Sequence, residues 1–183
     1  MKTGLLLIDI QNDYFPGGAM ELVDMERAAA VAGGMLERFR DEARPVYHLQ
    51  HLSVRPGATF FVPDTAGAEI HPTVSPHDGE TLFQKNFPNG FRGTGLLDAL
   101  RADGTGALVI CGAMSHMCID ATTRAAFDNG ISCTVLSDGC ATRDLEHEGR
   151  RIPAGDVHAA FMAALSVPYA RVVRAEALGA IES

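Results

Sequence analysis

The chain has 183 residues, which fits one domain over residues 1–183 with a sizeable core. Its formal net charge is −8, and its longest basic run is Arg150–Arg151. Nucleic acids and anionic membranes attract clusters of Lys and Arg, so the charge excludes both as expected partners. The opening apolar run, residues 5–8, is broken by Asp9 and is too short to span a membrane or act as a leader. We therefore expect a cytoplasmic protein with a small-molecule partner.

Short apolar runs alternate along the chain with segments of helical spacing. In chain order they predict a strand over 5–8, a helix over 25–39, strands over 45–49 and 81–83, a helix over 96–100, a strand over 107–111, a helix over 118–129, a strand over 132–136, a helix from Pro153 to about 165 and a strand over 170–173. This order predicts the α/β class, as a three-layer α/β/α Rossmann-like fold with a mainly parallel sheet of about six strands.

The stretch over residues 52–80 does not follow this alternation. It is rich in Pro, Gly and His and shows little periodicity. Loops of this length inside a compact domain usually serve a binding or catalytic site, so we expect a lid or a wall of a pocket here.

Polar side chains gather where the predicted strands end, the edge at which parallel α/β sheets bind ligands. They are Asp9, Gln11, Gln50, His51, Lys85, Ser115, His116, Cys118 and Asp138.

Cys118 is the candidate nucleophile among them. It follows a buried strand and a tight turn, and Ser115 is the expected N-cap, so Cys118 falls in the first turn of a helix. Free N–H groups at that position lower the pKa of a thiol and can hold an oxyanion. A buried structural thiol is an equally good interpretation of the position alone. No zinc or dithiol spacing is present, and the other thiols are expected to be reduced core residues: Cys111, Cys133 and Cys140.

A thiol that attacks a carbonyl needs a base and nearby positive charge. Asp9 follows four apolar residues and could accept the proton of the thiol; capping of a neighbouring loop is its alternative role. Lys85 follows a predicted strand and could stabilise developing negative charge; a solvated surface lysine is its alternative.

Three segments carry a family resemblance. Residues 9–15 (DIQNDYF) resemble the D-x-Q-x-D-F opening of isochorismatase-like cysteine hydrolases, residues 84–91 (QKNFPNGF) resemble their lysine motif, and residues 112–119 (GAMSHMCI) resemble their G-x-x-T/S-x-x-C-V nucleophile turn. Residues 138–141 resemble a following D-x-x-A segment. Each motif is weak alone, but the ordered set is specific, and the resemblance covers about residues 5–178.

The resemblance implies a catalytic triad of Asp9, Lys85 and Cys118. It implies the sheet order 3-2-1-4-5-6, a cis peptide between Ala113 and Met114, and an oxyanion hole made by the N–H groups of Met114 and Cys118. The approach of Lys85 to Cys118 follows from the resemblance alone. Members of the family are commonly assemblies, so a homo-oligomer, as a dimer or tetramer, is expected.

The sequence departs from the nicotinamidases, which resemble it but carry a D-x-H…H metal site after strand two. Residues 50–53 (QHLS) lack the aspartate that a hard divalent ion needs. We therefore expect no metal and no cofactor. The alternative metal site is an unplanned set of histidines: His48, His51, His71 and His77.

The predicted reaction is cleavage of a C–N bond in a small amide, lactam or ureide through a Cys118 thioester. Residues 115–126 are similar to a subgroup of broadly acting amide and lactam hydrolases, and N-carbamoylsarcosine amidases are related. Isochorismatase-type cleavage of a vinyl ether and a non-catalytic thiol sensor are the alternatives. A dinucleotide-binding oxidoreductase and an α/β serine hydrolase are excluded, because G-x-G-x-x-G after strand one and G-x-S-x-G are absent. The expected substrate contacts are Gln11, Phe15, Gln50, His51, Phe60, Phe61, Phe91 and His116.

Overall fold

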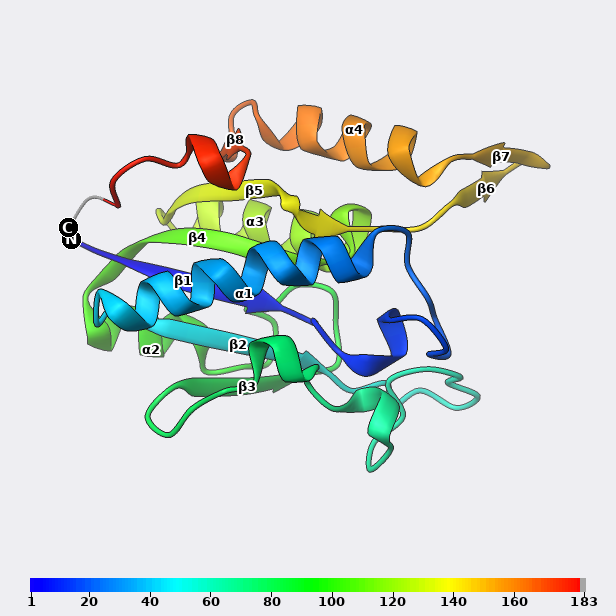
Figure 1. Ribbon diagram of the computed structural model, residues 1–183, viewed down its shortest axis with the longest axis horizontal. Helices are drawn as coiled ribbons and strands as arrows, with labels where there is room; N and C mark the ends of the chain where they lie inside the picture. Colours follow the sequence, from blue (N-terminus) through cyan, green and yellow to red (C-terminus); the bar gives the residue numbers. More distant parts are fainter. Residues whose placement is uncertain (182–183) are drawn as a thin grey trace.

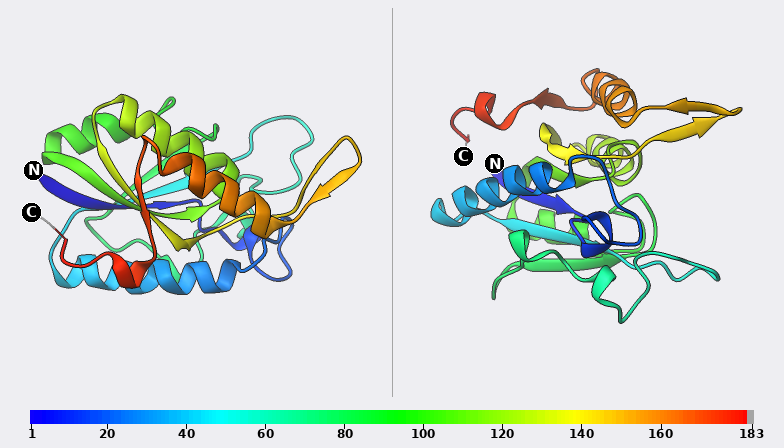
Figure 2. Two further views of the ribbon diagram at one scale, coloured as in Figure 1. Left: turned by 90° about the horizontal axis from the view of Figure 1, so that it is seen from above. Right: turned by 45° about the vertical axis from the view of Figure 1, so that its right-hand side comes forward.

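A computed structural model describes residues 1–181 and contains a six-stranded parallel sheet between two layers of helices (Figures 1 and 2). The sheet order is β3-β2-β1-β4-β5-β8, which confirms the predicted order with β8 as the sixth strand. Its strands are β1 (Lys2–Ile8), β2 (Val46–His51), β3 (Thr81–Lys85), β4 (Thr105–Ala113), β5 (Ser132–Ala141) and β8 (Arg171–Val173).

Helices cover both faces of this sheet, as Figure 2 shows from above. The long helix α1 (Met25–Asp41) packs on one face, while α2 (Leu96–Asp103), α3 (Asp120–Asp128) and α4 (Ala154–Leu165) cover the other. The side chains of β1 alternate between the two cores: Leu5 and Leu7 face α1, and Leu6 and Ile8 face the opposite layer. Double-sided burial explains why β1 reads as a continuous apolar run. Within residues 1–181, no helix has the length and apolar character needed to cross a membrane.

A two-stranded antiparallel hairpin lies outside the main sheet and was not predicted. It consists of β6 (Leu145–His147) and β7 (Arg150–Ile152), and it projects beyond the end of the sheet (Figure 1). Its strands have three residues each, and half of these residues are charged, so the strands are too short and too polar to show an apolar alternation. The predicted helix that follows begins one residue late, because Pro153 is the N-cap of α4.

Single turns occupy the connections. They are η1 (Asn12–Tyr14), η2 (Ala66–Ala68), η3 (Pro72–Val74) and η5 (Ala175–Ala177), together with the π-helical turn η4 (Ser115–Ile119) that precedes α3.

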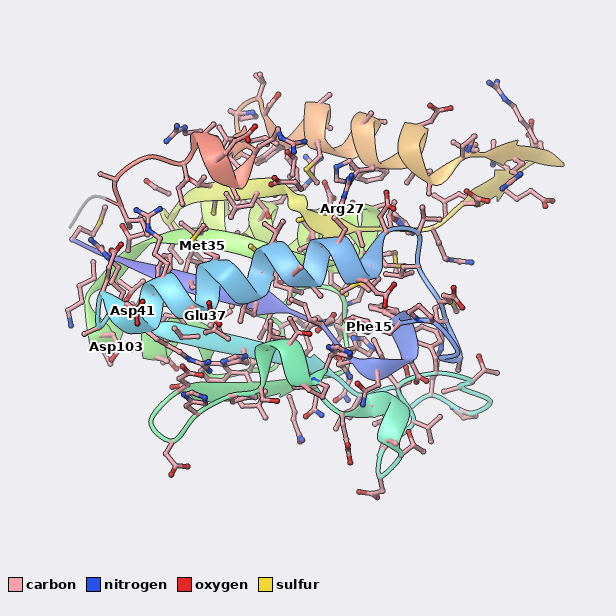
Figure 3. All side chains as sticks on the ribbon, viewed as in Figure 1. Phe15, Arg27, Met35, Glu37, Asp41 and Asp103 are labelled. Atoms are coloured by element: carbon pink, nitrogen blue, oxygen red, sulfur yellow. The ribbon has the colours of Figure 1, made fainter. Side chains whose placement is uncertain are left out.

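The chain changes direction across the sheet between β1 and β4, and this switch point positions the site. Gly112 lies near the end of β4 with φ +135°, and a Cβ there would come within 2.0 Å of the carbonyl oxygen of Ile8. The glycine of the nucleophile turn therefore allows the two strand ends to approach closely. Phe15 lies at this carboxyl edge, whereas Asp103 lies at the opposite end of the sheet (Figure 3).

Candidate active site

Lys85 is the centre of a buried cluster at the carboxyl edge of the sheet. It ends β3 directly opposite His51, the last residue of β2. Its Nζ lies 2.7 Å from Oδ2 of Asp9, 3.3 Å from Sγ of Cys118 and 3.1 Å from Nδ1 of His51. The side chains of Lys85 and Asp9 are both completely inaccessible to solvent. The long side chain of Lys85 thus extends past the end of β2 and contacts both other members of the implied triad, Asp9 and Cys118.

Asp9 directly follows β1 and is held by its backbone. Its N–H donates to the carbonyl of Leu49, and its φ of +52° lies in the left-handed region that residues other than glycine seldom adopt. Oδ2 accepts from Lys85, whereas Oδ1 is buried without a hydrogen-bond partner. A carboxylate oxygen of Asp9 lies within 4.8 Å of Sγ of Cys118. Asp9 therefore keeps a free lone pair near the sulfur.

Cys118 lies in η4, directly after the cis peptide bond between Ala113 and Met114. Burial raises the pKa of Cys118, the charge of Asp9 raises it further, and Lys85 lowers it by less. The expectation that the helix terminus lowers this pKa is therefore wrong, because desolvation and a neighbouring carboxylate oppose the charged form. Burial and the carboxylate of Asp9 therefore favour the neutral thiol over the thiolate.

Ser115 does not cap the helix as predicted. Met114 occupies the N-cap position, and Ser115 is the first residue of η4. The hydroxyl of Ser115 instead donates to the carbonyl of Ala141 and lies 2.9 Å from Nδ1 of His158. Ser115 thus fixes the turn against β5 and α4.

The charges in the cluster are well defined. Burial acts to lower the pKa of Lys85, but Asp9 and Cys118 outweigh it and raise the pKa above its ordinary value of 10.5. Burial and the charge of Lys85 lower the pKa of His51. His51 is therefore neutral, with its Nδ1 accepting from the Lys85 ammonium.

Asp9, His51 and Cys118 also present one oxygen, one nitrogen and one sulfur within 4.8 Å of one another, which is a possible set of metal ligands. The Lys85 ammonium contacts all three, so a metal ion would have to displace it. The set of four histidines does not converge: His48 binds Glu80, and His71 stacks on Phe15.

A cavity of about 390 Å³ opens above Cys118. Residues 53–60 form one wall, residues 86–88 form another, and η4 contributes the floor. The walls are largely apolar, as is usual for a small-molecule site. The lining residues are Tyr14, His51, Ser53, Val54, Arg55, Phe60, Asn86, Phe87, Pro88, Met114, Met117 and Cys118.

Two of the expected substrate contacts, His51 and Phe60, line this cavity. Gln11 is not among the lining residues and is fully buried. Its Nε2 donates to the carbonyls of His51 and Ala68, and its Oε1 accepts from the N–H of His51. Gln11 therefore joins the end of β2 to the loop that follows, and it makes no contact with the cavity.

The remaining expected contacts also lie outside the cavity. Phe15 is stacked against a histidine ring, and Phe61 is fully buried in the core. Gln50 faces a different hollow and donates to a loop carbonyl. Phe91 packs against the core on the α2 side, and Nδ1 of His116 lies 2.6 Å from the hydroxyl of Thr142.

Several cavity residues were missed from the sequence. Tyr14 and Phe87 lie inside the two motifs that identified Asp9 and Lys85, so proximity to a motif was an available signal. Met117 offered a similar signal, because it directly precedes Cys118. Ser53 and Arg55 belong to the irregular 52–80 stretch, where no periodicity indicates which side chains face inward.

Comparison with known proteins assigns the family. The protein-family model of the isochorismatase domain matches residues 3–175 of the sequence. The chain belongs to the isochorismatase family. The family member YddQ of Bacillus subtilis is 50% identical over 177 residues, which covers 97% of this chain and 98% of that protein.

Solved structures and named enzymes agree with this assignment. A structure from Oleispira antarctica, assigned as an isochorismatase hydrolase, has 49% identity and a TM-score of 0.93 over 97% of this chain and 95% of its own. Streptothricin hydrolase of Streptomyces noursei is 36% identical over 77% of this chain, a match that spans 50% of that enzyme. The nicotinamidase of Escherichia coli is a more distant relative at 27% identity over 74% of this chain and 81% of its own. The family is therefore one of hydrolases that include amidases.

Proposed function

We propose that the protein is a cysteine hydrolase that cleaves the C–N bond of a small amide, lactam or ureide. The observation that carries this proposal is the contact of Lys85 Nζ with both Asp9 and Cys118 under an apolar cavity. Relatives named streptothricin hydrolase and nicotinamidase support a hydrolytic reaction of this type.

The first step moves the proton of Cys118 to Asp9. The resting thiol is neutral, and Oδ1 of Asp9 is an unpaired acceptor near the sulfur. Transfer moves the negative charge from the carboxylate to the sulfur, and the Lys85 ammonium contacts both positions. Charge is therefore never left without a counterion in this low-dielectric site.

In the second step the sulfur attacks the carbonyl carbon of the substrate. The N–H groups of Met114 and Cys118 hold the oxyanion. No hydrogen bond links the Met114 N–H to another residue within 1–181, which leaves it available. The C–N bond breaks as Asp9 returns its proton to the leaving nitrogen, and a thioester remains on Cys118. Water, deprotonated by Asp9, then cleaves the thioester and restores the thiol.

The alternatives predict different behaviour. A thiol sensor needs a thiolate at rest, and the raised pKa of Cys118 opposes that role. Cleavage of a vinyl ether would proceed without an acyl group on Cys118. Of these routes, only attack of Cys118 on the carbonyl of an amide, lactam or ureide leaves an acyl or carbamoyl group on the sulfur.

The test combines turnover and trapping. Small amides, lactams and ureides are screened for release of ammonia or amine, and acid-quenched protein is weighed by intact mass spectrometry. We expect an acyl adduct on Cys118, and Cys118→Ala should lower turnover roughly 10⁴-fold while the circular dichroism spectrum is unchanged. Turnover that survives in Cys118→Ala, or turnover without any adduct in the wild type and in slow variants such as Cys118→Ser, overturns the mechanism.

A further inference from the structure

The reacting groups carry no net charge, but the residues that line the cavity above them include one cation. Asp9 and Lys85 compensate one another below the floor. Among the described residues that line the cavity, Arg55 alone has a permanently charged side chain. This cation is notable because the chain as a whole has a net charge of −8.

Arg55 has no protein partner within residues 1–181, because no hydrogen bond or ion pair joins its guanidinium to another side chain or carbonyl. Some other arginines of this acidic chain are paired, as Arg40 is with Glu80 and Arg124 with Asp120, but exposed arginines such as Arg101 share the unpaired state of Arg55 within the described residues, so the position of Arg55 on the cavity is what sets it apart. Ser53, two residues earlier, also lines the cavity, and its hydroxyl has no hydrogen-bond partner among residues 1–181. The exposed Arg55 and the buried Ser53 thus both offer unused donors to a largely apolar pocket that they line.

The backbone that carries these groups is anchored beside the reacting centre. The N–H of Leu52 donates to the carbonyl of Lys85, and the N–H of Ser53 donates to that of Phe61. A turn is closed by the N–H of Ala58 and the carbonyl of Arg55. Burial and Lys85 are the main causes of the lowered pKa of His51, and the charge of Arg55 lowers it further. The guanidinium of Arg55 is therefore near enough to act on the imidazole of His51, which lines the same cavity.

Arg92 lies 3.6 Å from the centre of the Phe87 ring, but it is not among the described residues that line the cavity. Arg55 therefore remains the one permanent cation of this lining, and the walls are otherwise largely apolar.

We propose that the substrate is a small amide, lactam or ureide that carries a carboxylate away from the scissile bond, and that Arg55, aided by the hydroxyl of Ser53, binds this carboxylate. The inference rests on the proposed function and narrows its substrate class. A guanidinium matches a carboxylate with two parallel hydrogen bonds, and the apolar walls suit the carbon chain between the two ends. Arg55 is thus a specificity-determining residue, while Asp9, Lys85 and Cys118 perform the chemistry.

The test uses a pair of probes of nearly equal shape and different charge, succinamate and succinamide. Each is assayed for protection of Cys118 against iodoacetamide at pH 9, with the labelled peptide quantified by mass spectrometry. We expect succinamate to protect the wild type at roughly tenfold lower concentration than succinamide. Arg55→Gln should abolish this difference, Arg55→Lys should retain part of it, and protection by succinamide should not change.

Arg101→Gln is the matched control, because it removes one exposed positive charge from α2 at the opposite end of the sheet. An equal difference between the probes in wild type and Arg55→Gln overturns the inference, as does an equal loss in Arg101→Gln. The readout needs no turnover, so it is independent of the proposed function. Charge-dependent protection without any thioester would refute the hydrolase mechanism alone, and hydrolysis of neutral amides without an effect of Arg55 would refute the carboxylate site alone.

Discussion

Removal of one member of the Asp9–Lys85 pair should damage stability more than removal of both. Both side chains are completely buried and lie 2.7 Å apart. In Asp9→Asn the ammonium loses its counterion in a medium of low dielectric, which costs roughly 3–5 kcal/mol of unfolding free energy. Lys85→Met leaves a buried carboxylate and should cost a similar amount. In the double variant, a neutral Asn and a neutral Met replace Asp9 and Lys85, and each is close in size to the residue it replaces. No unpaired charge is left buried, so the free energy of unfolding should return to within about 1 kcal/mol of wild type.

Urea unfolding at pH 7, followed by circular dichroism, measures the four free energies. A loss of 3 kcal/mol or more corresponds to a fall of roughly 6–12 °C in melting temperature for a domain of this size. Catalysis should behave differently: turnover should be lost in all three variants, because the double variant has neither base nor ammonium. If the stability losses of the single variants add in the double variant, the two charges are not energetically coupled, contrary to this prediction.

Three further predictions concern the same cluster and the assembly. Iodoacetamide labelling of Cys118 should accelerate only above about pH 9; the profile should move to higher pH in Lys85→Met and to lower pH in Asp9→Asn, because the ammonium lowers the pKa of the thiol and the carboxylate raises it. Unmoved profiles in both variants contradict the charge assignment. Dialysis against a strong chelator should leave turnover unchanged, since the ammonium fills the space between the possible ligands; loss of activity that zinc restores contradicts this. Light scattering should give a dimer or tetramer of the 19.5 kDa chain, and a monomer at micromolar concentration is the opposing result.

The fold was predictable because its signals are local. Buried parallel strands read as apolar runs, and α1 reads as an apolar stripe at helical spacing. The hairpin over residues 145–152 escaped because three-residue strands that project into solvent need no apolar pattern. In the sequence, this polar and charged segment is indistinguishable from an ordinary surface loop.

The site was predictable only in part, because its signals are not local. Asp9 and Cys118 follow neighbouring central strands, so the switch-point rule brings them together. Lys85 ends an edge strand, and only the family resemblance placed it at the sulfur. The direction of the pKa shift of Cys118 was missed, since the sequence reveals neither its depth of burial nor the closeness of a carboxylate. Arg55 was not predicted as a cavity residue, because the irregular 52–80 stretch has no periodicity that indicates which side chains face inward.

The buried side chains of Gln11 and Asp13 have a consequence for how new activities arise in this chain. Gln11 fastens Ala68 to the end of β2, and the carboxylate of Asp13 accepts from the N–H groups of Phe61 and Ala19. These two attachments fix the base of the loop while residues 54–60 remain free to vary between them. Mutational libraries confined to 54–60 should therefore diversify substrate preference at little risk to the reacting groups. The same libraries extended to positions 11 and 13 should yield mostly inactive proteins.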